Sequence, residues 1–267
     1  MRLKKYLTLT RAGMIEALQF RMSTLVAILG NLIYLVIIYY LWKAIYASVE
    51  TGTVNGMTFE DTMIYLVLAT ALFSFMEVFL VWNMGRNIQS GKITLDLIKP
   101  MKYENFMFWQ FSGSYVMSFF TTFLPTSIVV YIVTKGALQI GINLLFFLVS
   151  VIFALLINFY IDFFVGTICL HTESIWGINI MKEVVVLLLS GASIPIAFFP
   201  EPLKTIVFYL PFQAIYNTPL RLLINNSMSY SERFQLLLLQ IMWVALLYAG
   251  SKMFWKSSLR KITVNGG

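Results

Sequence analysis

The chain has 267 residues, 59% of them hydrophobic and 12% charged, and its mean hydropathy is +0.81. Soluble domains carry about 25% charged residues, so this chain has too little polar surface to cover a water-soluble globule. The net charge of +7 resides in basic residues at the ends of apolar stretches, a pattern that indicates membrane topology and argues against nucleic-acid binding. The single cysteine, Cys169, excludes an internal disulfide framework and a cysteine-rich metal site.

Six apolar stretches are each long enough to cross a bilayer, which takes about 20 residues. They cover residues 22–47, 59–82, 105–133, 142–170, 176–199 and 234–255. We therefore expect an all-α membrane protein, with one domain over residues 1–267 and six transmembrane helices. The first apolar run is too long for the core of a cleavable signal peptide, so we expect the N-terminus to be retained.

Basic residues are distributed unevenly between the two sides of these six spans. Lys and Arg are enriched in the cytoplasmic segments of membrane proteins. The richer side has Arg2, Lys4, Lys5, Arg11, Arg21, Arg86, Lys92, Lys99, Lys102, Lys252, Lys256, Arg260 and Lys261. The other side has only Lys43, Lys135, Lys204, Arg221 and Arg233. We therefore expect both termini to be cytoplasmic.

Residues 1–21, before the first span, predict an amphipathic helix. At 3.6 residues per turn one face carries Leu3, Tyr6, Leu7, Met14, Ala17 and Leu18. Basic residues flank this apolar face, as in helices that lie in the membrane interface. We expect an interfacial helix on the inner leaflet, and the alternative is an ordinary basic juxtamembrane segment.

Residues 86–102, between the second and third spans, predict a short cytoplasmic helix. Thr94 is suited to cap it, Asp96 suits its first turn and Pro100 ends it. Its apolar surface comes from Leu95, Leu97 and Ile98. Such a stiff, partly apolar helix suits the docking of another subunit, and a plain interfacial loop is the alternative.

Enzymatic motifs are incomplete in this sequence. The run from Gly85 to Lys92 is similar to a phosphate-binding loop, but its first glycine comes one place too early. Ile93 stands where Ser or Thr must hold magnesium, so we expect no ATP binding or hydrolysis by this chain. His171 is the only histidine and lies near Glu173, and we expect a polar interfacial residue and no catalytic role.

Four charged residues fall inside predicted spans, where charges are costly and face protein or water. They are Glu77, Asp162, Lys182 and Glu183. At a rise of 1.5 Å per residue, the first three lie about 8–12 Å from the cytoplasmic boundary. We expect Lys182 to pair with Asp162 or Glu77. The pair would either fix helix packing or line a substrate path.

Residues 201–231, between the fifth and sixth spans, contain apolar pieces that are too short to cross a bilayer. The prolines at 200, 202, 211 and 219 separate these pieces, which cover residues 203–210 and 212–223. We expect two short re-entrant helices on the outer face, packed against protein. A simple outer loop is the alternative.

Two stretches resemble the ABC-2 type permease family, the membrane subunits of ABC exporters. The run from Gly91 to Pro100 resembles a cytoplasmic segment of that family. The run from Leu189 to Phe199, with Gly191, Pro195 and the following Pro200, is similar to the end of its fifth span. In the family this ending precedes two short re-entrant helices and a sixth span. The amphipathic N-terminal helix is similar to the family's connector helix.

The resemblance implies one half of a transporter in the bacterial cytoplasmic membrane. A second permease chain, identical or a sister, would complete it, and separate ATPase subunits would bind ATP and magnesium. The coupling residues would be Gly91, Thr94, Leu95, Leu97, Ile98, Lys99 and Pro100. The first, second and fifth spans would line the dimer interface and the substrate route. Small residues for close packing there would be Ala69, Thr70, Ala71, Ser190 and Gly191.

Two other classes compete with an exporter permease. A secondary transporter or channel would work without an ATPase and would be expected to carry a coupling carboxylate at the midplane or broken helices in both halves. An intramembrane enzyme would need catalytic motifs that are incomplete here. The aromatic residues of the spans fit an amphipathic, lipid-like or drug-like substrate and equally a lipid-facing surface. They include Phe119, Phe120, Phe146, Phe147, Phe163 and Phe164.

Overall fold

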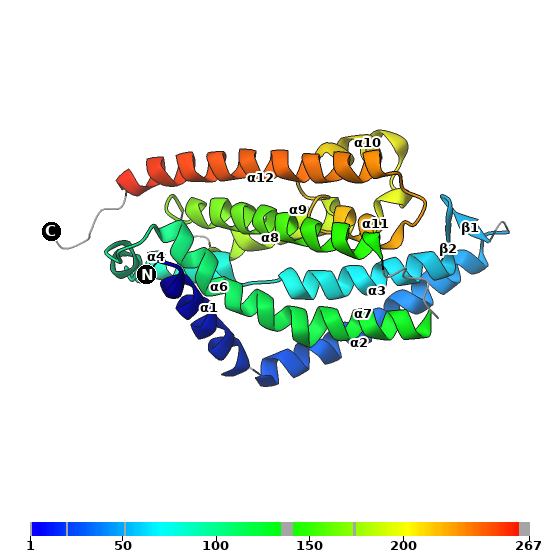
Figure 1. Cartoon of the computed structure of the whole chain (residues 1–267), viewed down its shortest axis with the longest axis horizontal. Coiled ribbons are helices and arrows are strands. Elements are labelled where there is room, and N and C mark those ends of the chain that lie inside the picture. Colours follow the sequence, from blue (N-terminus) through cyan, green and yellow to red (C-terminus); the bar gives the residue numbers. More distant parts are fainter. Residues whose placement is uncertain (1, 20, 51, 135–140, 173–174, 262–267) are drawn as a thin grey trace.

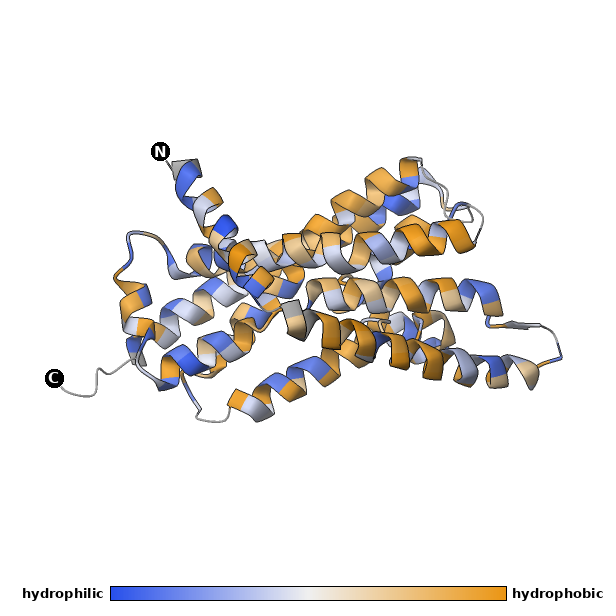
Figure 2. Cartoon of the chain, turned by 90° about the horizontal axis from the view of Figure 1, so that it is seen from below, coloured by the Kyte–Doolittle hydropathy of each residue, from blue (hydrophilic) through white to orange (hydrophobic). Residues whose placement is uncertain are grey.

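Long helices running roughly along one axis make up most of the chain (Figure 1). The computed structural model describes residues 2–19, 21–50, 52–134, 141–172 and 175–261. The start of α1 (Arg2–Gln19) and the end of α12 (Tyr230–Ser258) lie at one end of the molecule. Figure 2 shows apolar residues along the helices and polar residues more often toward the two ends, as expected for a chain that crosses a bilayer.

Within the described residues, five helical segments are long and apolar enough to cross a membrane. They are Leu25–Ala47, Phe59–Gln89, Tyr103–Val133, Ile142–Ile168 and Tyr230–Ser258. The first lies in α2 (Arg21–Ala47), and the fourth and fifth correspond to α8 (Ile142–Ile168) and α12. Each falls on a predicted span, so the all-helical, multi-pass architecture is confirmed at these five places.

The predicted fifth span, residues 176–199, is shorter than expected. Its helix α9 (Ile175–Leu189) has 15 residues and is therefore about 22 Å long, less than the roughly 30 Å of a hydrocarbon core. The helix stops because Gly191 adopts a left-handed conformation, with φ of +80°, and Pro195 follows. Five of the six predicted membrane-spanning helices are therefore long enough to cross a bilayer among the described residues, and α9 as a sixth stays a prediction.

Two of the predicted spans are also interrupted within their length. The second consists of α3 (Phe59–Met76) and α4 (Leu80–Gln89), separated by residues 77–79. The third consists of α6 (Tyr103–Ser118), a π-helical turn η1 (Phe119–Phe123) and α7 (Leu124–Val133). Pro125 lies in the first turn of α7, and its missing N–H explains the widened turn just before it.

Short elements lie at the end of the molecule opposite the start of α1 (Figure 1). The predicted apolar pieces form α10 (Glu201–Tyr209) and α11 (Asn217–Ile224), after a 3₁₀ turn η2 (Ile196–Phe198). A small hairpin of β1 (Thr53–Val54) and β2 (Met57–Thr58) departs from the all-α expectation. Asn55 and Gly56 turn it with φ of 49° and 79°, and this Asn-Gly pair was a readable hairpin signal.

The hydrophobic core surrounds α3 and α8. Leu68, Leu72 and Met76 of α3 and Ile157 of α8 are fully buried. α8 also packs against α4, α11 and α12, so it contacts both the broken second span and the short outer helices. This central position lets α8 present polar side chains to several elements at once.

The helix α1 packs against protein and not only against lipid. It crosses α6 so closely that a Cβ at Gly13 would lie 2.1 Å from the Gln110 carbonyl oxygen. A Cβ at Gly113 would lie 2.3 Å from the Thr10 carbonyl oxygen, so both glycines are needed for the crossing. Tyr6 stacks on Trp109 with 5.2 Å between ring centroids. The predicted apolar face is therefore divided between residues that contact α6 and residues that stay exposed, and the interfacial position of the helix stays a prediction.

The rest of that predicted face remains open. Leu7 and Leu18 of α1 are 56% and 55% exposed. These residues keep the amphipathic character that suggested a lipid contact, while Tyr6, Met14 and Ala17 are partly buried.

Replacing Gly113 with alanine should separate α1 from α6, because the added methyl group meets backbone atoms that have little freedom to move. We expect a loss of about 2 kcal/mol of stability, typical of overpacking, measured by thermal unfolding of the purified chain in detergent. Gly250→Ala in α12 is the matched control, since a Cβ there meets nothing within 4 Å. Equal stability of both variants would contradict the close crossing.

Candidate functional site

A break in the second span forms the centre of the candidate site. α3 ends at Met76, and Glu77 continues as extended backbone with φ of −69° and ψ of 114° before α4 begins at Leu80. Broken helices leave carbonyl groups without helical partners. The side-chain amide of Asn158 on α8 donates a hydrogen bond of 3.2 Å to the Met76 carbonyl. The break is therefore stabilised by a specific side chain from a neighbouring helix.

An ion pair lies beside this break. The Lys182 ammonium of α9 is 2.9 Å from a carboxylate oxygen of Asp162 on α8, and the two side chains are 13% and 2% exposed. This is one of the two pairings expected from the sequence, and the structure selects Asp162 over Glu77. By helix rise, Asp162 lies about 9 Å from the end of α8, so the pair joins α8 to α9 well inside the bundle.

The other two carboxylates complete the cluster. Glu77 is exposed at the break and lies within electrostatic range of Lys182 and Glu183. Glu183 accepts a hydrogen bond of 2.5 Å from the Asn179 side-chain amide, one turn earlier on α9. The structure thus brings all four predicted charges together, with three carboxylates around one ammonium group. The surplus negative charge favours contact with water or with a further cationic group.

Four residues of this cluster were not predicted. Asn158 and Asn179 are buried, as are Tyr115 of α6 and Tyr216, which lie within electrostatic range of Asp162. An asparagine inside an apolar helix is a visible polar interruption, so Asn158 and Asn179 had a signal in the sequence. Tyr115 and Tyr216 could not be recognised in the sequence as members of the cluster, because tyrosine is common in membrane proteins.

The cluster lies beside irregular backbone within a helical segment that is long and apolar enough to cross a membrane. Irregular backbone within a membrane is tolerated where it is buried in protein or lines an aqueous cavity. In the described part of the chain, acidic, His and Cys residues form no group that could hold a metal ion. The exposed Glu77 carboxylate and Phe79, 64% exposed, make the break an open surface of the single chain.

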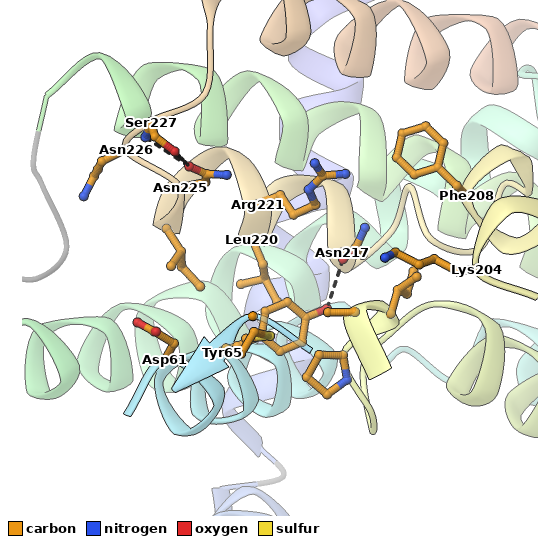
Figure 3. Close-up of a pocket in the computed structure, with 16 residues that line it drawn as sticks. Asp61, Tyr65, Lys204, Phe208, Asn217, Leu220, Arg221, Asn225, Asn226 and Ser227 are labelled. Carbon is orange, nitrogen blue, oxygen red and sulfur yellow. Dashed lines mark hydrogen bonds between the residues drawn. The ribbon is translucent and has the colours of Figure 1, made fainter. Parts of the chain in front are cut away.

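The predicted re-entrant motif lies at the outer end of α9. Gly191 accepts a hydrogen bond of 2.9 Å from the Tyr65 hydroxyl, and that hydroxyl lies 3.5 Å from Asn217 Oδ1 on α11, the contact drawn in Figure 3. Pro195 precedes η2, and Pro200 precedes α10. Each of the three motif residues therefore sits where the chain turns. Whether α10 and α11 re-enter a membrane stays a prediction.

Several small residues that were expected at the dimer interface are buried within the single chain. Ala69, Ala71 and Ser190 are 0%, 5% and 0% exposed. Gly191 has Tyr65 and Ile196 within 3.0 Å of a built Cβ. These residues are packed inside the single chain, so the expectation that they face a second permease chain is wrong.

The predicted coupling segment contains the short helix α5 (Ile93–Leu97). Ile93 is 2% exposed and anchors it, whereas Leu95 and Ile98 are 62% and 79% exposed. Gly91 turns the chain into α5 with φ of +71°. The predicted cap is wrong: Lys92 occupies the N-cap, and the Thr94 hydroxyl donates back to the Gly91 carbonyl over 2.7 Å.

Lys99 and Asp96 hold α5 against its neighbours. The Lys99 ammonium lies 2.7 Å from Asp96 and 3.6 Å from the ring centroid of Phe106 on α6. Asp96 also accepts a hydrogen bond of 3.4 Å from Asn87 of α4. Pro100 follows the helix in an exposed turn. The apolar surface that remains open to a partner is therefore that of Leu95 and Ile98.

His171 lies beyond the end of α8 and contacts α12. Its Nε2 atom is 2.8 Å from the Ser258 hydroxyl, and its ring stacks on Phe254 with 5.5 Å between centroids. This joins the ends of two helices. The expected neighbour Glu173 lies outside the described residues.

These features define a class: a multi-pass helical membrane protein with a broken second span, a short fifth helix and two short outer helices. Residues 32–266 match a family model described as "ABC-2 family transporter protein". The chain belongs to this family, which confirms the resemblance seen in the sequence, and membership implies association with ABC ATPase partners in general. No curated protein matches the chain.

Removing one partner of the Lys182–Asp162 pair should be costly. Asp162→Leu leaves a buried ammonium without its carboxylate, and we expect a loss of about 3 kcal/mol of stability. The double variant with Lys182→Met replaces the pair with apolar groups and should recover most of that loss. Thermal unfolding and transport are both measured. Recovery of both supports a packing role, whereas recovery of stability alone supports a role in the substrate route.

Alanine at Gly191 should destabilise the outer end more than alanine at Gly91. Both glycines have positive φ, which costs about 1 kcal/mol or more for alanine. Only at Gly191 would the methyl group also press on Tyr65, 2.9 Å away, while at Gly91 it meets nothing. We expect Gly191→Ala to lower the unfolding temperature clearly further. Equal shifts for the two variants would refute the steric part of this explanation.

Proposed function

We propose that the chain is the membrane-spanning permease subunit of an ABC exporter in the bacterial cytoplasmic membrane. It moves an amphipathic, lipid-like or drug-like substrate outward, with both of its termini in the cytoplasm. Separate ATPase subunits bind ATP and magnesium and carry out the hydrolysis. Family membership supports this function, and the exposed apolar surface of Leu95 and Ile98 on an anchored helix is the observation that carries it.

A mechanical path from α5 to the polar cluster supports the coupling role. α5 is tied to α4 through Asp96 and Asn87 and to α6 through Lys99 and Phe106. α4 starts at the break beside Glu77. A force on α5 therefore moves α4 about the break, which acts as the hinge between the cytoplasmic and outer parts of the second span.

Close packing makes α4 move as part of a unit. A Cβ at Gly166 of α8 would lie 2.8 Å from the sulfur of Met84, and one at Gly85 would lie 2.7 Å from Ile175 of α9. α4 is thus packed tightly between α8 and α9, the two helices that the Lys182–Asp162 pair joins. Motion at α5 would reach the cluster through these contacts.

A second permease chain, identical or a sister, would cover the face formed by α2 and the break. α2 is exposed over most of its length, and Trp42 and Tyr46 are among the few of its residues that are buried. Glu77 is exposed at membrane depth, where a carboxylate facing lipid costs about 3 kcal/mol. A water-filled route between two chains removes this cost, so we place Glu77 on that route.

The aromatic residues contribute less to substrate choice than the sequence suggested. Phe146, Phe147 and Phe163 are 6%, 1% and 0% exposed and fill the core, so they line neither lipid nor a route. Phe120 is 58% exposed. The proposed amphipathic substrate therefore rests on the polar cluster with apolar surface around it.

The double variant Leu95→Asp with Ile98→Asp should strongly weaken capture of the ATPase subunits. These side chains are the exposed apolar anchors of α5, and a charge at each would disfavour burial in an interface. We expect at least a tenfold weaker association in co-purification from membranes, with unchanged thermal stability. Lys256→Asp, also exposed and in the last turn of α12, is the control.

Two results would reject the proposed function. One is a wild-type chain that purifies without any ATPase under mild conditions. The other is transport that continues after ATP is depleted, which would favour the secondary transporter or channel.

A further inference from the structure

A pocket of about 680 Å³ lies at the outer end, far from the polar cluster's helix break and between short elements. The β-hairpin, the start of α3, residues 195–197, α10, α11 and the turn at residues 225–227 surround it. Its volume lies within the range of about 300–1,000 Å³ that is usual for small-molecule sites.

Arg221 is the main charged group in the pocket. It projects from α11, is partly buried and lies 5.7 Å from the ring centroid of Phe208. Among the described residues its guanidinium group makes no hydrogen bond and no ion pair. The nearby Glu232 attracts it through space, but that carboxylate is held by the Ser229 backbone N–H at 2.8 Å. A half-buried guanidinium group whose donors have no protein acceptor is suited to bind an anion.

A second cation is available beside it. Lys204 of α10 pairs with Glu201 at 3.1 Å, but these side chains are 42% and 82% exposed, so the pair is weak and easily exchanged. The single lining carboxylate, Asp61, is occupied because the Thr58 hydroxyl donates to it over 2.6 Å. Lys204 and Arg221 thus outnumber Asp61, and the pocket has a net positive charge.

Figure 3 shows how polar and apolar groups divide the pocket. Lys204, Asn217 and Arg221 lie near one another on one side, with Tyr65 below them. Leu220, Ile196 and Ile224 supply apolar lining, together with Phe208. An arginine fork binds phosphoryl oxygens in pairs, and an adjacent apolar wall accepts an alkyl chain. The combination suits a ligand that has an anionic head and an apolar part.

We propose that this pocket binds the phosphoryl head of an anionic amphiphile, with Arg221 and Lys204 contacting the anion and Phe208 and Ile224 contacting the apolar part. Its position on the outer face rests on the proposed function, which supplies the orientation in the membrane. The binding itself does not, because it needs neither the ATPase nor transport. Binding to a lipid headgroup and binding to free phosphate share this chemistry and are separated by the test.

The test measures ligand binding to the purified full-length chain in neutral detergent by native mass spectrometry. The probes are a short-chain phosphatidylglycerol, a short-chain phosphatidylcholine and inorganic phosphate. We expect phosphatidylglycerol to bind at least tenfold more tightly than either of the others, and Arg221→Gln to lower its affinity about tenfold or more. Arg221→Lys keeps the positive charge but loses the paired N–H donors of the guanidinium group. Its affinity for phosphatidylglycerol should therefore lie between those of the wild type and Arg221→Gln.

Lys43→Gln is the matched control. Lys43 is exposed near the end of α2, at the same end of the molecule, and does not line the pocket. It should bind phosphatidylglycerol as the wild type does, and thermal unfolding confirms that each variant is folded.

Three outcomes would overturn the proposal. These are unchanged binding in Arg221→Gln, an equal loss in Lys43→Gln, and equal affinity for inorganic phosphate and phosphatidylglycerol. Failure of ATPase capture in the earlier experiment would leave this binding result intact, so the two proposals fail separately.

Discussion

The ion pair between Lys182 and Asp162 joins two helices at a depth where neither charge would be stable alone. It holds α9 against α8, and α8 in turn supplies the Asn158 amide that stabilises the end of α3. A helix break inside a membrane needs such partners, because lipid offers its free carbonyl groups no hydrogen bonds. The ion pair positions α8 against α9, and the Asn158 amide of α8 stabilises the end of α3. Glu77 is exposed because it lies in the break that follows α3.

The short α9 has consequences at the opposite end of the molecule. Because this helix stops at Leu189, the chain has to complete its path with turns at Gly191, Pro195 and Pro200. Those turns place α10 and α11 beside the β-hairpin and the start of α3 and so create the positively charged pocket. The tight contact of Gly191 with Tyr65 fixes the turn, so the pocket and the helix length share one cause.

At the end of the molecule where α1 begins and α12 ends, α5 and α1 are both attached to the helices beside them. α5 is a single turn with a buried anchor, an internal ion pair and two exposed apolar residues. α1 is bound to α6 through two facing glycines, so it moves with the bundle. Both elements are therefore held by specific contacts against the helices behind them.

The sequence by itself determined what depends on local composition and periodicity. Apolar lengths located five spans, and the proline spacing located α10 and α11. The intramembrane charges were visible as well, because Asp162 and Lys182 interrupt apolar runs.

Only the tertiary structure decided which distant residues meet. The choice of Asp162 over Glu77 depends on the packing of α8 against α9, and the close crossing at Gly13 and Gly113 joins segments 100 positions apart. The burial of Ala69, Phe147 and Phe163 could not be predicted from the sequence either. An apolar residue in a membrane helix is equally hydrophobic whether it faces lipid or protein. In a bilayer, hydrophobicity identifies which segments enter, and shape and hydrogen bonding decide which faces touch.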